Sequence, residues 1–168
     1  MQTLYNNSVY IHIISATILV GGMFFLFLVL IPVLRKPEFQ GLFAKIFYQA
    51  GVRFRLVRWV SLLLLVLTGI FNLAYRGYGF SDLTTGRMFE GPFGRVLLQK
   101  LVIVGLIVLT SVVHDFWIGP RASELMRAGP ESPESRKYRS AAVWIGRLNF
   151  IMALLIVLLA VMLVRGGL

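Results

Sequence analysis

Four long apolar stretches limit the fold of this chain more than any other feature. They cover about residues 9–34, 56–75, 96–118 and 143–164. Each is long enough to cross the hydrocarbon core of a bilayer, which takes about 20 helical residues. Hydrophobic residues make up 58% of the 168 positions, against roughly 45–50% in soluble domains. We therefore expect an all-α integral membrane protein, a four-transmembrane-helix bundle in which residues 1–168 form a single domain.

The positive side chains gather in two of the three connections between these stretches. The positive-inside rule places both connections in the cytoplasm and both termini outside. The net charge of +10 then reflects orientation and contact with anionic lipid, and no nucleic-acid partner is expected. Between the first and second stretches these residues are Arg35, Lys36, Lys45, Arg53, Arg55 and Arg58. Between the third and fourth stretches they are Arg121, Arg127, Arg136, Lys137, Arg139 and Arg147.

The first connection also predicts a short amphipathic helix at the membrane surface. Its apolar residues recur at i, i+3 and i+4 spacing, from Phe39 to Phe47, with Lys45 and Arg53 placed elsewhere. Pro32 and Pro120 are expected at or near helix ends, where a missing backbone donor matters least.

Ionisable and strongly polar side chains are costly within the bilayer, so each one inside a span is a candidate functional residue. In the predicted topology His12 lies within about one helical turn of the outer boundary. Asn72 and Lys100 come to a similar level, so the three side chains are expected to converge. Arg95, at the outer interface, and Lys100 form a basic pair suited to an anionic group such as a carboxylate, a phosphate or a haem propionate.

A second polar cluster is expected at the inner side. His114 and Asp115 lie near the inner end of the third span, at the level of Asn149. His12 and His114 are therefore too far apart in depth to bind one haem or one metal ion together. Two separate sites, or none, fit this separation better.

The types of side chain restrict the metal chemistry. Cysteine is absent, so a soft metal would have to use histidine and methionine. Met23 follows His12 by 11 residues and returns to nearly the same helix face, which suits a His-to-Met ladder for Cu(I). His12, His114 and Met23 are thus the candidate metal ligands.

A purely structural interpretation stays open for each of these residues. Met23 would be apolar packing. His12 would be a neutral imidazole hydrogen-bonded to a neighbouring helix, for instance to Asn72. Lys100 would extend its amine to the outer interface. His114 and Asp115 would form an interface pair that ends the helix.

Residues 52–109 resemble the copper-resistance D (CopD-like) family of bacterial inner-membrane proteins, and with the first helix the resemblance covers roughly residues 10–120. The strongest match is "GPFGRVLLQKL", which is similar to the family's Pro-aromatic-Gly-Arg-x-Leu-Leu-x-Lys-Leu motif. Further matches are the pair Arg53 and Phe54, the triplet Leu67, Thr68 and Gly69, and a Leu-x-Thr in the outer loop: Leu83, Thr84 and Thr85.

This resemblance implies copper homeostasis, by uptake or delivery, in a multi-pass protein of the bacterial inner membrane. It implies a periplasmic copper-binding partner besides the lipid bilayer, and a homo-oligomer is also considered. A weaker similarity to HemJ-type protoporphyrinogen oxidases, carried by His12, Lys100 and His114, implies instead a membrane oxidoreductase that binds haem b. A third hypothesis is a non-catalytic membrane assembly subunit. Copper handling is preferred, and whether the protein is an enzyme stays open.

Overall fold

The structure, a computed structural model, describes residues 1–129 and 131–165, and every regular element in them is a helix. The first half holds α1 (Gln2–Phe24), the π-helix η1 (Phe25–Leu30), α2 (Ile31–Leu34), the 3₁₀ helix η2 (Pro37–Leu42), α3 (Phe43–Tyr75) and α4 (Phe80–Thr84). The second half holds the 3₁₀ helix η3 (Arg87–Phe89), α5 (Gly91–Val113), the π-helix η4 (His114–Ile118), α6 (Gly119–Ala128) and α7 (Pro133–Val164).

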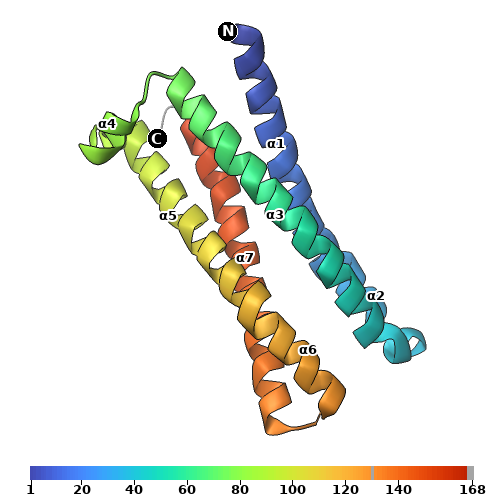
Figure 1. Cartoon of the computed structure of the whole chain (residues 1–168). Coiled ribbons are helices and arrows are strands. Elements are labelled where there is room, and N and C mark those ends of the chain that lie inside the picture. The colour runs from blue at the N-terminus through green and yellow to red at the C-terminus, as the bar shows by residue number, and fades with distance from the viewer. Residues whose placement is uncertain (130, 166–168) are drawn as a thin grey trace. The chain divides into compact units, whose positions relative to one another are not determined.

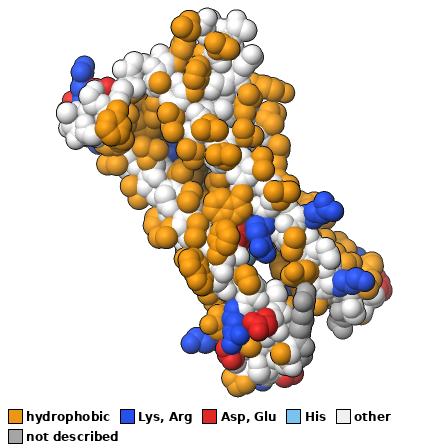
Figure 2. Space-filling view, viewed as in Figure 1, with side chains coloured by type: hydrophobic (Ala, Val, Ile, Leu, Met, Phe, Trp, Pro, Cys, Tyr) orange, Lys and Arg blue, Asp and Glu red, His pale blue; other side chains and the backbone are white. Residues whose placement is uncertain are grey.

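The expected four spans are confirmed. Four helices are long and apolar enough to cross a membrane: Gln2–Leu34, Phe43–Tyr75, Gly91–Met126 and Pro133–Val164. Each is longer than the stretch predicted from hydropathy, because the polar residues at its ends continue the same helix. Apolar side chains cover much of the face shown in Figure 2, as expected of helices that face lipid.

The chain divides into two compact units, Met1–Thr84 and Thr85–Leu168. In unit 1, α1 and α3 pack side by side as an antiparallel pair (Figure 1). Small polar side chains are buried on both helices, namely Ser8 and Ser15 on α1 and Ser61 and Thr68 on α3. Small residues at a helix interface let two backbones approach closely within a membrane.

Unit 2 is built in the same way from α5 and α7, with α6 also packed on α7 (Figure 1). Its buried apolar residues include Val96, Leu97 and Ile107 on α5, and Met152 and Leu159 on α7. The start of α7 follows from its sequence: Ser132 caps the helix by accepting a hydrogen bond from the Ser135 backbone N–H at 3.1 Å. Pro133 follows in the first turn, where no N–H is needed.

Pro32 lies near a helix end as expected, two residues before Leu34, whereas the same expectation is wrong for Pro120, whose helix continues to Ala128. Both helices continue past the proline, and a π-helical segment precedes each one: Phe25–Leu30 before Pro32 and His114–Ile118 before Pro120. A proline inside a helix removes one N–H and clashes with the carbonyl four residues earlier. That carbonyl lies inside the widened π turn in both cases, which explains how the helix continues.

The amphipathic surface helix predicted between the first two spans is not confirmed as a separate element. The 3₁₀ helix η2 covers Pro37–Leu42, and the residues from Phe43 onward are the first turns of α3. No proline interrupts α3, so the surface segment and the span form one continuous helix. The placement of both termini outside stays a prediction, and the last three residues of the chain lie outside those that the structure describes.

Candidate functional site

His12 lies in the N-terminal half of α1 and contacts a threonine of the facing helix α3. Its Nδ1 is 2.7 Å from Oγ1 of Thr68. The same Thr68 hydroxyl lies 2.6 Å from the backbone carbonyl oxygen of Leu64, one turn earlier in α3. His12 is half-buried and Thr68 is buried. The expected alternative partner, Asn72, is therefore not the residue that Nδ1 of His12 contacts.

These two contacts assign the tautomer of His12. A hydroxyl has one hydrogen, and the carbonyl of Leu64 can only accept, so the Thr68 hydrogen is used in that bond. Nδ1 of His12 must then be the donor in its own bond to Thr68. In the neutral imidazole this leaves the lone pair on Nε2. A histidine that binds a metal usually has this arrangement, with one ring nitrogen donating to a protein oxygen.

Further polar residues lie beside His12 and Thr68, toward the N-terminus of α1 and the C-terminus of α3. Ser8, one turn before His12, places its hydroxyl 3.5 Å from the carbonyl oxygen of Thr68. Asn72, one turn after Thr68, has a buried Oδ1 with no hydrogen-bond partner among the described residues. Gly69 lies beside the imidazole, because a Cβ added there would be 3.6 Å from Cε1 of His12.

An aromatic pair lies at the start of α1 and the end of α3. The rings of Tyr5 and Tyr75 are stacked with centroids 4.3 Å apart. The Tyr75 hydroxyl donates to Oε1 of Gln2 at 2.8 Å. Tyrosine is common at the membrane–water interface, where its ring is apolar and its hydroxyl is hydrated. The tyrosine pair thus suits a position at the membrane surface, between His12 and the N-terminal end of α1.

Met23 is buried and lies on the same face of α1 as His12, as the spacing predicts. The helix is continuous between them, so 11 residues separate the two by about 16 Å. One metal ion cannot bind both side chains at that distance. Only a ladder of separate positions is compatible with this geometry.

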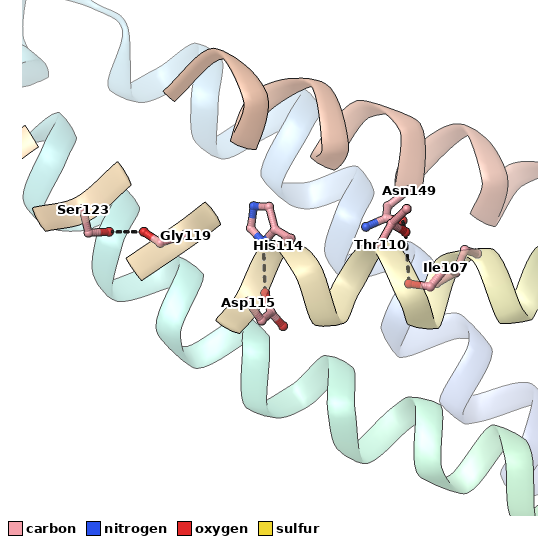
Figure 3. A network of polar contacts seen from close by, with 7 residues as sticks. All are labelled: Ile107, Thr110, His114, Asp115, Gly119, Ser123 and Asn149. Atoms are coloured by element: carbon pink, nitrogen blue, oxygen red, sulfur yellow. Dashed lines mark hydrogen bonds and ion pairs between the residues drawn. The ribbon is translucent and has the colours of Figure 1, made fainter. Parts of the chain in front are cut away.

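Unit 2 carries its own polar cluster (Figure 3). Nδ1 of His114 is 2.9 Å from Oδ1 of Asp115, whose side chain is 2% exposed. One turn earlier on α5, the Thr110 hydroxyl is 2.6 Å from Oδ1 of Asn149 on α7. A carboxylate only accepts, so His114 also donates from Nδ1 and, when neutral, has its lone pair on Nε2. The expected inner cluster of His114, Asp115 and Asn149 thus lies on the α5–α7 pair.

Lys100 and Arg95 belong to α5 in unit 2, with Lys100 half-buried and Arg95 exposed. They are five residues apart, which places them about 7 Å apart along the axis of α5. The predicted convergence of Lys100 with His12 and Asn72 stays a prediction. Within residues 1–129 and 131–165, no three His, Asp or Glu side chains gather as a metal site.

Thr68 is the residue of this site that the sequence did not single out as a partner of His12. A signal was present, since Thr68 and Gly69 form part of the motif shared with the family named above. Gly94 of the motif "GPFGRVLLQKL" also has a structural reason: an added Cβ would overlap the backbone of Phe89 in η3. The motif residues therefore have two roles: Thr68 orients the imidazole of His12, and Gly94 allows close packing of α5 against η3.

Comparison with known proteins identifies the family. Residues 48–163 match the family described as copper resistance protein D. The chain belongs to the copper resistance protein D family. An uncharacterized protein of Aquifex aeolicus is 34% identical over 154 residues, which cover 90% of each chain. No solved structure matches this chain. As a member of that family, it is a multi-pass membrane protein related to copper resistance.

Proposed function

We propose that the protein acts in copper homeostasis, in uptake or delivery, and that Nε2 of His12 receives Cu(I). The observation that carries this proposal is the hydrogen bond from Nδ1 of His12 to Thr68. It fixes the ring and places the lone pair on the other nitrogen, as in known metal-binding histidines. Copper is the cargo in this proposal rather than a resident cofactor.

The composition of unit 1 favours a soft metal ion at His12. The span Gln2–Leu34 contains no Asp, Glu, Lys or Arg, and the half of α3 that faces His12 has no Asp or Glu. Magnesium and calcium require several oxygen ligands, usually carboxylates. Cu(I) accepts imidazole and thioether ligands, so the neutral surroundings of His12 disfavour the hard cations more than they disfavour Cu(I).

A site with one imidazole suits transfer better than storage. Most coordination positions of an ion bound to Nε2 of His12 would be filled by another molecule. A periplasmic copper-binding protein that presents sulfur or imidazole ligands is the partner we propose. Met23, about 16 Å further along α1, is the proposed next position for the ion after His12.

The remaining candidate residues have secondary roles in this proposal. His114, whose Nδ1 is bonded to Asp115, is a second and separate imidazole position in unit 2. Asn72 supplies a buried amide oxygen one turn from Thr68. Arg95 and Lys100 are proposed to hold an anionic group, such as a carboxylate of the copper-carrying partner.

The first test is the metal content and absorption spectrum of the detergent-solubilised protein, expressed with ample copper and haem. We expect copper in the wild type, less in His12→Ala, and no Soret band. A Soret band that is lost in His12→Ala would instead support the haem b oxidoreductase. An unchanged copper content in His12→Ala, with a loss in His114→Ala, would move the site to unit 2. Stoichiometric co-purification with a larger complex and without copper would favour an assembly subunit.

A further inference from the structure

The first half of α7 exposes two arginines and a tryptophan on one side, which we call the α7 basic face: Arg139, Trp144 and Arg147. Cζ of Arg147 lies 5.2 Å from the centroid of the Trp144 ring, a cation–π distance. Trp144 is 64% exposed, and both arginines are exposed. Eight residues separate Arg139 from Arg147, so they lie about 80° apart around the helix and about 12 Å apart along it.

Protein carboxylates do not neutralise this face. In the part of the chain that the structure describes, no acidic side chain pairs with Arg139 or Arg147. The nearby glutamates are engaged elsewhere, with Glu124 and Glu134 on Arg121 and Glu131 on Arg136. The two guanidinium groups can therefore bind an anion from outside the chain without breaking an ion pair within it.

The length of α7 places this face at the lipid headgroups. The helix ends at Val164, and Arg165 follows as the first charged residue at that end. About 20 residues cross the hydrocarbon core, so the core begins near residue 145. Trp144 and Arg147 then lie at the edge of the core, whereas Arg139 lies about 9 Å outside it. The phosphate layer falls between the two arginines.

We propose that the α7 basic face binds the headgroup of an anionic phospholipid in the adjacent leaflet. Arg147 lies at the edge of the core and Arg139 about 9 Å outside it, and arginine side chains are long enough for both to bind a phosphodiester at the level between them. The indole of Trp144 lies at the depth of the glycerol esters, where tryptophan is enriched. A zwitterionic lipid has the same phosphate, but its ammonium group offsets the attraction to the arginines.

The test is native mass spectrometry of the full chain in detergent, with phosphatidylglycerol or phosphatidylcholine added. Removing one arginine is expected to weaken phosphatidylglycerol binding about fivefold, and the double variant R139Q/R147Q roughly 25-fold. The matched control K36Q/K45Q removes two exposed lysines of unit 1 and the same total charge, and it should weaken the binding much less than R139Q/R147Q does. R139K/R147K keeps the charge and should retain most of the binding.

Three results would overturn the proposal. Equal losses in R139Q/R147Q and K36Q/K45Q would show attraction to net charge rather than to this face. Equal binding of phosphatidylcholine and phosphatidylglycerol by the wild type would exclude selection of an anionic headgroup. Displacement of phosphatidylglycerol by millimolar glycerol phosphate would identify a soluble phosphate ester as the ligand. Binding of copper at His12 is independent of all three.

Discussion

At the scale of single residues, Thr68 determines what His12 can do. Its hydroxyl hydrogen is bonded to the helix backbone, so toward α1 the side chain is only an acceptor. Threonine commonly donates in this way to the carbonyl four residues earlier in a helix. In the α1–α3 pair, this hydrogen bond of Thr68 determines the tautomer of His12 on the neighbouring helix.

Replacing Thr68 by valine keeps the shape of the side chain and removes the acceptor for Nδ1 of His12. We expect Cu(I) affinity to fall about 10- to 100-fold, the usual cost of losing a group that orients a metal-binding histidine. Thr68→Ser keeps the hydroxyl and should stay near the wild-type affinity. Competition with a colorimetric Cu(I) chelator measures both variants. Equal affinities for the valine and serine variants would show that the hydrogen bond does not orient the ligand.

The sequence predicted a polar partner for His12 on a neighbouring helix, but it did not select the correct residue. Thr68 and Asn72 are four residues apart and share one face of α3, so helical periodicity cannot distinguish between them. The choice depends on how far α1 and α3 are shifted along each other. Side-chain contacts set that shift, including Gly22 against Phe54, and no local pattern in either helix encodes it.

At the scale of helices, Gly22 sets the distance between α1 and α3. An added Cβ at Gly22 would overlap the ring of Phe54, whereas a Cβ at the adjacent Gly21 meets nothing within 4 Å. Gly22→Ala should therefore destabilise the protein by about 1 kcal/mol, since the ring must shift. Gly21→Ala should be neutral or stabilising, because alanine favours the helix. Thermal unfolding in detergent compares them, and equal midpoints would contradict this packing.

Gly94 has a stricter requirement, because its neighbour is backbone. A Cβ added to this buried residue in the first turn of α5 would overlap the main chain of Phe89. Backbone cannot rotate away as a side chain does, so Gly94→Ala should cost about 1–3 kcal/mol. Gly105→Ala, in open space on the same helix, is the matched control. Unfolding at the same temperature in both variants would exclude a packing role for Gly94.

The helix boundaries were predictable only in part. Hydropathy located all four spans, because about 20 apolar residues in a row have few other folds. It missed the continuation of the third span through Pro120 to Ala128, since a proline more often ends a helix than follows a π turn. The sequence also predicted a separate surface helix for the amphipathic residues near Phe43, whereas these residues form the first turns of α3.

At the scale of the whole molecule, four spans place both termini on the same side of the membrane. The positive-inside rule makes that side the outer one. The chain has no cysteine, so single cysteines can be labelled without background. Gln2→Cys and Ser81→Cys should react with a membrane-impermeant maleimide in intact cells, and Gln49→Cys and Ser140→Cys only after lysis. The reverse pattern would invert the topology and place His12 on the cytoplasmic side.

The proposal that His12 is the copper ligand is tested most directly by anaerobic Cu(I) titration of the purified protein. The wild type should bind Cu(I) with an affinity that falls at least tenfold in His12→Gln, while His114→Gln should keep that site. The helical circular dichroism of all three proteins should be the same, because glutamine is tolerated in a helix. Undiminished Cu(I) binding by folded His12→Gln would contradict the account.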